Sequence, residues 1–239
     1  MSNKKLKIVI TDCDHPSVEI ERAILSEIDP GLILAYCNTE DEVIEAAKDA
    51  DGIINQYAPI TRRVIESLKR CKVIARYGVG VDNIDVEAAT EHKIIVANVP
   101  DFCIDEVSTH TMALILACAR GIILLDRKIK EKKWDFTLAK PLFRTQGKIL
   151  GLFGLGNIAR AVAKKASGFG FKIIAYDPYV SKVNLGVKLV ELSQLLSDSD
   201  FVSIHTPLTV ETRNSFGKNK LKVMNKNCLS DKYFTWTCY

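Results

Sequence analysis

Apolar and polar residues alternate with two different periods along the first hundred residues. Runs rich in β-branched residues predict short strands at 7–12, 32–37, 52–56, 72–78 and 94–99. Between these runs, apolar residues recur with helical spacing and predict helices that begin near Ser17, Glu40, Thr61 and Asp85. Strands that alternate with helices over short connections are typical of a parallel sheet with helices on both faces. We therefore expect a flavodoxin-like α/β domain over residues 1–100.

Three of these helices begin at a residue that can cap them. Ser17, Thr61 and Asp85 each carry a side-chain oxygen that can accept a hydrogen bond from a free backbone N–H of the first turn. We expect all three to act as N-caps.

The pattern changes after Pro100 and Asp101. Nearly continuous apolar residues predict one long helix from about 105 to 132, and such a helix is expected to be buried between two bodies. After a polar connector, strands and helices alternate again, at 148–154, 157–169, 171–177, 189–198 and 201–207. We expect a second α/β domain over residues 101–217, followed by a basic, divergent tail at 218–239.

Composition narrows the class of protein. Of the 239 residues, 47% are hydrophobic and 26% are charged, as in ordinary globular proteins. The net charge of +4 comes from the segment after Gly217, where five lysines stand against Asp231 alone, so the body is neutral and nucleic acid is not an expected partner. The most apolar helix is too short to span a membrane, and no signal peptide precedes the first strand.

The seven cysteines are scattered, odd in number and never arranged as a CxxC pair. This pattern argues against a disulfide framework and against a zinc site, and it suits the reducing cytoplasm. We expect a cytoplasmic protein without a metal.

A glycine loop carries the main chemical signal. Gly154, Gly156 and Ala159 form a GxGxxA pattern between a predicted strand and a predicted helix, and Asp177 ends the next strand. The first glycine permits a tight turn, the second lets a pyrophosphate approach the helix N-terminus, and the carboxylate can accept hydrogen bonds from a ribose. Its charge favours NAD over NADP. The alternative is an ordinary glycine turn, with Asp177 capping its strand.

His205, Thr206 and Pro207 follow the third strand of the second domain. Because ligands of open parallel sheets lie beyond the carboxyl ends of the strands, we expect these residues near the cofactor. For His205, a turn residue that bonds its own backbone is an equally weighted alternative.

Five motifs occur in a fixed order, ARYGVGVDNID (75–85), VANVPDFCIDEVSTHTMALILA (96–117), GLFGLGNIARAVA (151–163), YDPY (176–179) and HTPLTVETRN (205–214). They resemble the D-isomer-specific 2-hydroxyacid dehydrogenases, a family that includes phosphoglycerate, glycerate and D-lactate dehydrogenases and the related C-terminal-binding-protein corepressors. The similarity extends from about residue 6 to about residue 224. It implies a substrate domain, a long linking helix, and a Rossmann doubly wound NAD domain that is incomplete in this chain. A homodimer is expected if the chain is stable.

The resemblance also implies roles for individual residues. Its substrate loop, which binds a small 2-hydroxy or 2-oxo acid through backbone amides, matches Tyr77, Gly78, Val79 and Gly80. Its cofactor contacts match the pyrophosphate-binding Asn157 and Ile158, the ribose-binding Asp177, and Thr206, Pro207 and Thr212.

The catalytic residues of the family find no match. The family uses an arginine, a glutamate and a histidine from the last part of its chain, whereas this sequence continues after Met224 with NKNCLSDKYFTWTCY. His15, His92, His110 and His205 do not match the catalytic position. Arg76 is the nearest alternative cation, although pairing with a surface acid is its expected role.

The resemblance therefore predicts a C-terminal truncation, with a tail that resembles the product of a reading-frame shift. Only three strands are predicted in the NAD domain, so a sheet edge and apolar faces are expected to be exposed. The favoured hypothesis is an NAD-dependent 2-hydroxyacid dehydrogenase with impaired activity. The alternatives are a non-enzymatic NAD-binding or interaction protein, similar to the corepressors, and an inactive relic.

Overall fold

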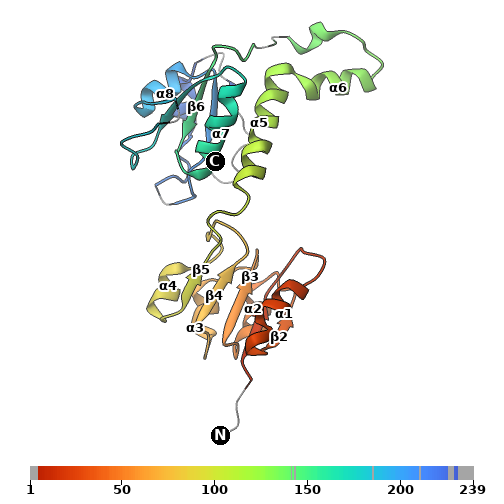
Figure 1. Cartoon of the computed structure of the whole chain (residues 1–239), viewed down its shortest axis with the longest axis vertical. Coiled ribbons are helices and arrows are strands. Elements are labelled where there is room, and N and C mark those ends of the chain that lie inside the picture. Colours follow the sequence, from red (N-terminus) through yellow and green to blue (C-terminus); the bar gives the residue numbers. More distant parts are fainter. Residues whose placement is uncertain are drawn as a thin grey trace. The chain divides into compact units, whose positions relative to one another are not determined.

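The structure is a computed structural model of the chain, and it divides the chain into two compact units, Met1–Phe102 and Cys103–Tyr239 (Figure 1). It describes residues 5–140, 142, 144–184, 186–209 and 211–225, and the backbone of 229–230. Each unit is built around its own parallel sheet. The predicted tail beyond residue 230 lies outside the described residues.

The sheet of the first unit has the strand order β2-β1-β3-β4-β5, and all neighbouring strands are parallel. Its strands are β1 (Lys7–Ile10), β2 (Gly31–Leu34), β3 (Gly52–Asn55), β4 (Val73–Arg76) and β5 (Ile95–Ala97). This order is that of flavodoxin-like folds, so the expected class is confirmed.

The helices of this unit are α1 (Glu19–Ile24), the 3₁₀ helix η1 (Leu25–Ile28), α2 (Glu40–Ala47), α3 (Arg62–Ser67) and α4 (Val86–Glu91). Of the three predicted caps, Asp85 accepts a hydrogen bond from the Ala88 N–H at 2.8 Å. Ser17 accepts one from the N–H of Glu19, the first residue of α1, at 3.4 Å, although Val18 occupies the N-cap position itself. Thr61 stands before α3 without a side-chain cap bond, so its predicted cap is wrong. The reciprocal cap that the sequence analysis missed joins Thr39 and Glu42 at α2.

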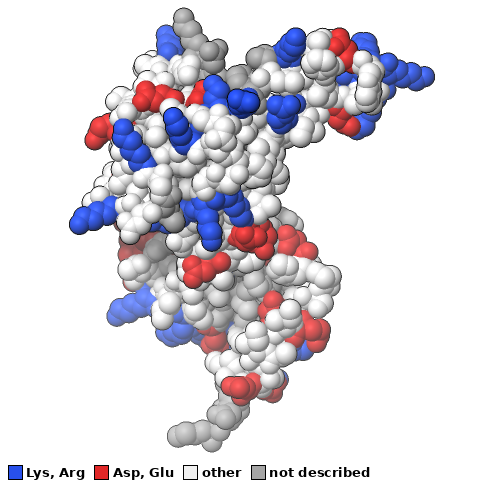
Figure 2. Space-filling view, turned by 45° about the horizontal axis from the view of Figure 1, so that its top comes forward, with Lys and Arg blue, Asp and Glu red and all other residues white. Residues whose placement is uncertain are grey.

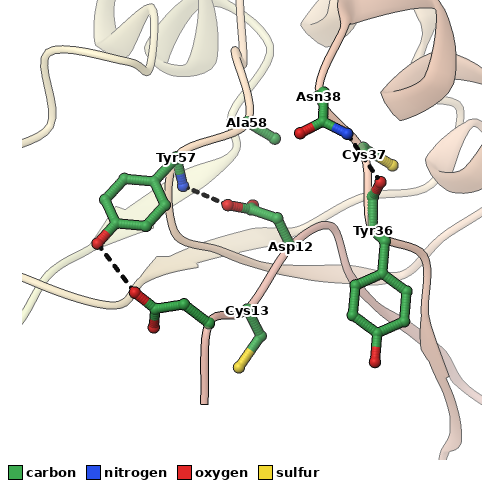
Figure 3. A pocket seen from close by; sticks show the side chains of 8 residues that line it. Asp12, Cys13, Tyr36, Cys37, Asn38, Tyr57 and Ala58 are labelled. Atoms are coloured by element: carbon green, nitrogen blue, oxygen red, sulfur yellow. Dashed lines mark hydrogen bonds between the residues drawn. The ribbon is translucent and has the colours of Figure 1, made fainter. Parts of the chain in front are cut away.

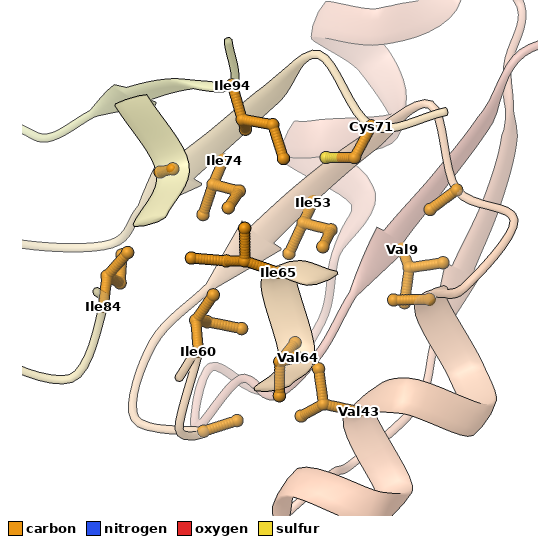
Figure 4. Packing of buried hydrophobic residues seen from close by; sticks show 14 of the residues in the cluster. Val9, Val43, Ile53, Ile60, Val64, Ile65, Cys71, Ile74, Ile84 and Ile94 are labelled. Atoms are coloured by element: carbon orange, nitrogen blue, oxygen red, sulfur yellow. The ribbon is translucent and has the colours of Figure 1, made fainter. Parts of the chain in front are cut away.

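The two faces of this sheet are buried unequally. Val9, Ile53 and Ile74 pack against α2, α3 and α4 in one core, where these three side chains are at most 1% exposed (Figure 4). Val73 and Ile95, which are direct cross-strand neighbours, point to the other face and are 38% and 68% exposed. Parallel sheets are normally covered on both faces. The first unit therefore presents an apolar face.

The second unit has a five-stranded parallel sheet in the order β10-β9-β6-β7-β8. Its strands are β6 (Ile149–Phe153), β7 (Lys172–Tyr176), β8 (Val187–Leu189), β9 (Phe201–Ile204) and the two-residue β10 (Leu229–Ser230). The prediction of only three strands is wrong because β8 and β10 are too short to show a period. Both are defined by pairing, β8 with β7 and β10 with β9.

The predicted long helix is two helices, α5 (Ile104–Arg120) and α6 (Ile122–Lys130), with a bend of 63° between them. Gly121 makes the break with φ +61°, a left-handed conformation that suits glycine. Among the described residues no single helix is long and apolar enough to cross a membrane, and only this bent pair passes by length and composition.

The remaining helices of the unit are the 3₁₀ helix η2 (Phe136–Ala139), α7 (Asn157–Gly168), α8 (Leu192–Asp198) and α9 (Lys218–Val223). One core lies between the sheet, α5 and α7, and contains Leu150, Val162 and Phe171. A second core joins the sheet to α8 and contains Leu195, Ile204 and Met224. The expectation of exposed apolar faces on this sheet is therefore wrong for the described residues.

Candidate dinucleotide and substrate-binding sites

The glycine loop of the second unit runs from the end of β6 to the start of α7. Gly154 has φ +91°, and a Cβ added there would lie 2.8 Å from Thr206 Cγ2 and 2.9 Å from the His205 carbonyl oxygen. Glycine is therefore required at this position because the end of β9 passes close to the loop.

Gly156 has a different environment. It is the N-cap residue of α7, it makes no side-chain cap bond, and a Cβ added to it would meet no atom within 4 Å. Open space thus lies at the N-terminus of a 12-residue helix, where the dipole and backbone N–H groups favour an anion. Asn157 is exposed and Ile158 half-buried in the first turn, and the small Ala159 is fully buried in the core.

Asp177 follows β7 and holds the glycine loop from beside it. Its carboxylate accepts hydrogen bonds from the Leu155 N–H at 2.8 Å and from the Tyr179 N–H at 2.9 Å. Each carboxylate oxygen has a further lone pair, so these bonds leave acceptor capacity for a ribose. The capping role that the sequence allowed as an alternative is therefore present in the structure.

His205 and Thr206 stand after β9, against the glycine loop. The His205 ring nitrogen Nε2 lies 2.9 Å from Oγ of the fully buried Ser203, so the ring bonds this side chain instead of its own backbone. Burial lowers the pKa of His205 to about 4, and the imidazole is neutral near pH 7. Within the described residues, the buried Oγ1 of Thr206 has no hydrogen-bond partner.

Pro207 and Thr212 form a turn after these residues. The Thr212 hydroxyl donates to the Pro207 carbonyl at 2.6 Å and accepts from the Thr209 N–H at 2.7 Å. Thr212 therefore holds the turn together, which leaves the exposed Pro207 as its outer surface.

In the first unit, the predicted substrate loop follows β4. Gly78 has φ +137°, and its carbonyl accepts from the Val99 N–H at 3.0 Å, while the Val79 carbonyl accepts from Asn98 Nδ2 at 2.7 Å. Within the described residues the N–H groups of Val79 and Gly80 donate to no protein acceptor. Two backbone donors are thus available to a carboxylate.

The neighbours of this loop differ from expectation. Tyr77 donates its hydroxyl hydrogen to Glu21 at 2.7 Å, and burial together with this carboxylate raises the pKa of the Tyr77 phenol far above its usual value. Arg76 pairs with no acid among the described residues, so that expectation is wrong. Its guanidinium lies over Gly78, where an added Cβ would be 1.9 Å from Arg76 Nη1, and its buried Nε has no partner in the described part of the chain.

A buried polar network supports the loops of the first unit. Asn55, which is fully buried, donates to Thr11 Oγ1 at 3.0 Å and accepts from Asn83 Nδ2 at 2.7 Å. Asp12 accepts from the N–H groups of Gln56 and Tyr57. The sequence analysis missed Asp12 and Asn83, although a carboxylate directly after the first strand was a signal for Asp12.

In the described residues, no group of three or more His, Cys, Asp or Glu side chains is placed to hold a metal ion. Several predicted cofactor-binding residues lie close together at the glycine loop. Gly154 contacts the end of β9, and Asp177 accepts a hydrogen bond from Leu155, between Gly154 and Gly156. The open space at Gly156 and the unpartnered Thr206 hydroxyl fit a dinucleotide.

Comparisons with known proteins identify a dinucleotide-binding domain in the second unit. Residues 112–229 match the model of the D-isomer specific 2-hydroxyacid dehydrogenase NAD binding domain. The chain is 42% identical to a D-3-phosphoglycerate dehydrogenase of Methanocaldococcus jannaschii over 94% of this chain and 43% of the relative. It is 41% identical to a hydroxypyruvate reductase of Thermotoga maritima over 77% of this chain and 60% of the relative. The chain thus spans about half the length of these relatives.

Solved structures share the fold of this chain. A glyoxylate reductase from Paecilomyes thermophila aligns with a TM-score of 0.84 at 27% identity, covering 95% of this chain and 73% of that chain. An NAD-dependent formate dehydrogenase from Staphylococcus aureus, solved in complex with NAD, aligns with a TM-score of 0.82 at 29% identity, covering 92% of this chain and 70% of that chain. The chain belongs to the D-isomer-specific 2-hydroxyacid dehydrogenase family, and its second unit carries the NAD-binding domain of that family.

Proposed function

We propose that the protein is an NAD-dependent oxidoreductase of the D-2-hydroxyacid dehydrogenase class, built for hydride transfer between NAD and a small 2-hydroxy or 2-oxo acid, and that its activity is impaired in this chain. The observation that carries the proposal is the open space at Gly156, in front of the N-terminus of α7, with Asp177 beside it. The family of the chain and the named activities of its relatives support it.

In this proposal the start of α7 holds the pyrophosphate. Gly156, Asn157 and Ile158 place the positive end of the helix dipole against the diphosphate. The second acceptor positions of Asp177 bind the adenosine ribose, and its negative charge repels a 2′-phosphate, which favours NAD over NADP. Thr206, with Pro207 and the turn at Thr212, completes the cofactor site, where the buried Thr206 hydroxyl gains its missing partner.

In this proposal the acid substrate binds to the loop after β4. The free N–H groups of Val79 and Gly80 bind its carboxylate, and the Arg76 guanidinium beside Gly78 adds a positive charge. Tyr77, held by Glu21, supports this loop. Bound NAD supplies the hydride acceptor or donor, and these residues orient the acid.

His205 is a poor proton donor near pH 7, because burial lowers its pKa to about 4. None of the four histidines of the sequence matches the catalytic position of the family. We therefore assign no catalytic residue, and we expect NAD binding with little or no turnover.

The proposal is tested by calorimetric titration of the chain with NAD and NADP. Asp177→Asn should weaken NAD binding by about tenfold and narrow the preference over NADP, because a hydrogen-bond acceptor and a charge are lost. Asp198→Asn is the control, since Asp198 is an exposed carboxylate of the same unit on α8. Equal NAD affinity in all three proteins would contradict the cofactor site.

Turnover is tested separately by following NADH oxidation with glyoxylate, hydroxypyruvate and pyruvate. Binding of NAD without oxidation is the expected result. Rapid oxidation of NADH would show that the assignment of no catalytic residue is wrong, while leaving the oxidoreductase proposal intact.

We also propose that two copies of the chain associate through α6. Ile122, Ile123 and Ile129 of this helix are between 51% and 60% exposed, and α6 extends away from β6 and its sheet (Figure 1). An exposed apolar patch of this kind is typical of an interface. Cys13, Cys37 and Cys71 are free thiols, which favours the reducing cytoplasm as the compartment.

A further inference from the structure

A cavity of about 340 Å³ lies at the carboxyl end of the sheet in the first unit. Its walls are residues 12–14 after β1, 36–38 after β2 and 57–58 after β3. In open parallel sheets with this strand order, ligands bind beyond the carboxyl ends of the strands where the order reverses, next to β1 and β3. The volume is sufficient for a group the size of a side chain.

The cavity is negatively charged. Asp14 accepts from Gln56 Nε2 at 2.7 Å and from the Tyr57 hydroxyl at 3.2 Å, and the Gln56 bond is the main reason why the pKa of Asp14 is lowered. The Asp14 side chain is 58% exposed, so a ligand can reach it, whereas Asp12 is occupied by two loop N–H groups. No lysine or arginine is among the described residues that line the cavity.

Two aromatic rings flank these carboxylates. Tyr36 and Tyr57 are each 65% exposed and lie on either side of the Asp12–Cys13 segment (Figure 3). The face of an aromatic ring attracts a cation, and nearby carboxylates attract the same cation through their charge. An anionic group such as a phosphate would instead meet two carboxylates, and the described lining residues offer it no lysine or arginine.

The opposite charge is found two strands away. Arg76 is the last residue of β4, and the N–H groups of Val79 and Gly80 follow it. Only β3 separates β4 from β1. Two strand spacings amount to about 10 Å. A 2-oxo acid with a guanidinium six bonds from its carboxyl carbon spans about 7–8 Å, so with one hydrogen bond at its end it reaches from one region to the other.

We propose that this cavity binds the cationic end, an ammonium or a guanidinium, of a ligand and rejects a phosphate. This inference rests on the proposed function, because the carboxylate of the acid substrate is placed at the loop after β4. It adds that the substrate is an acid with a cationic tail. The cavity itself depends only on Asp14, Tyr36 and Tyr57. A cation that carries no carboxylate could bind the same cavity, and the experiment distinguishes it from an acid with a cationic tail.

The test is calorimetric titration of the full chain with four compounds. 2-Oxo-5-guanidinopentanoate carries both charges, 2-oxopentanoate lacks the cation, butylguanidinium lacks the carboxylate, and 3-phosphohydroxypyruvate carries a phosphate. We expect the guanidino acid to bind about tenfold more tightly than 2-oxopentanoate, and the phosphate compound to bind most weakly.

Two variants locate the effect. Asp14→Asn keeps an acceptor for Gln56 but removes the charge, and should abolish the tenfold gain. Asp49→Asn removes an exposed charge at the amino end of the same sheet and should leave the gain unchanged. Loss in Asp14→Asn with retention in Asp49→Asn supports the proposal.

Other outcomes show which kind of ligand binds, or contradict the proposed cation site. In one outcome, butylguanidinium binds the parent chain but not Asp14→Asn, and 2-oxopentanoate does not bind. This result supports a site for a cation without a carboxylate and contradicts the proposed substrate loop. Equal affinity for the guanidino acid and 2-oxopentanoate overturns the cation site while the substrate loop stands. A gain that survives Asp14→Asn, or tightest binding of the phosphate compound, also overturns it.

Discussion

At the scale of single residues, the two glycines of the loop between β6 and α7 are needed for different reasons. Gly154 combines a positive φ with close contact to Thr206 and the His205 carbonyl, whereas Gly156 has an ordinary φ of −75° and open space around it. Gly154 is therefore needed for the packing of the unit, whereas Gly156 leaves space for the ligand.

This difference predicts opposite results for two alanine variants. Gly154→Ala should lower the free energy of unfolding by about 2 kcal/mol, because backbone strain and a steric clash coincide. Gly156→Ala should change that free energy by less than about 0.5 kcal/mol but weaken NAD binding, because its methyl group occupies the space for the diphosphate. Urea unfolding measures the first effect and NAD titration the second. A Gly154→Ala variant that unfolds at the same urea concentration as the parent chain would contradict the assignment.

His205 predicts how stability depends on pH. Its pKa is about 4 in the folded chain and about 6.5 in an unfolded chain, so between these values the unfolded chain binds a proton that the folded chain excludes. Stability should therefore fall as the pH drops from about 6.5 to about 4, by at most about 3 kcal/mol. His205→Gln, which can still bond Ser203, should flatten the pH profile in this window. Identical slopes for both proteins would show that His205 does not contribute.

At the scale of elements, the starts of two helices show how capping depends on geometry. Thr39 accepts from the Glu42 N–H while the Glu42 carboxylate accepts from the Thr39 N–H at 3.0 Å, and backbone bonds from Asn38 and Thr39 lower the pKa of Glu42. Thr61 occupies the same position before α3, yet its buried hydroxyl oxygen has no partner in the described residues.

We expect Thr39→Ala to lower the free energy of unfolding by about 1 kcal/mol, since both bonds of the cap involve this residue. Thr61→Ala is the matched control and should have almost no effect, because no cap bond is lost. Denaturant unfolding of the two variants provides the comparison. An equal loss in both would mean that Thr61 caps α3 in solution.

The break between α5 and α6 also depends on tertiary contacts. The apolar pattern runs through Gly121 without interruption, so periodicity predicts one helix where the structure has two. A Cβ at Gly121 would lie 2.8 Å from Ala139 Cβ, so the break also depends on a segment that follows later in the chain. Periodicity cannot report such a contact.

At the scale of the whole molecule, the two units differ in charge and in what they leave exposed. The first contains 12 Lys and Arg against 18 Asp and Glu, and the second contains 21 against 11. The neutral body expected from the total charge thus consists of two units of opposite charge, and Figure 2 shows basic side chains spread over the visible surface of the second unit. A positive unit suits an anionic dinucleotide.

The exposed isoleucines of α6 predict the state of association. Ile122→Glu combined with Ile129→Glu should convert a dimer into a monomer, because charges replace apolar side chains without touching the core of the unit. Ile20→Glu combined with Ile24→Glu on α1 is the control, since these isoleucines are 71% and 72% exposed. Sedimentation equilibrium measures the mass of each protein. A monomeric parent chain would contradict the interface.

The sequence by itself determined the α/β class, the alternation of elements in both units and the glycine loop, because periodicity and glycine spacing are local properties. Tertiary structure alone decided which residues meet. It paired β8 and β10 with longer strands, buried Asn55 in a polar network that supports the loops of the first unit, and placed Arg76 over Gly78. These outcomes depend on packing between segments far apart in the chain, and no local pattern encodes such contacts.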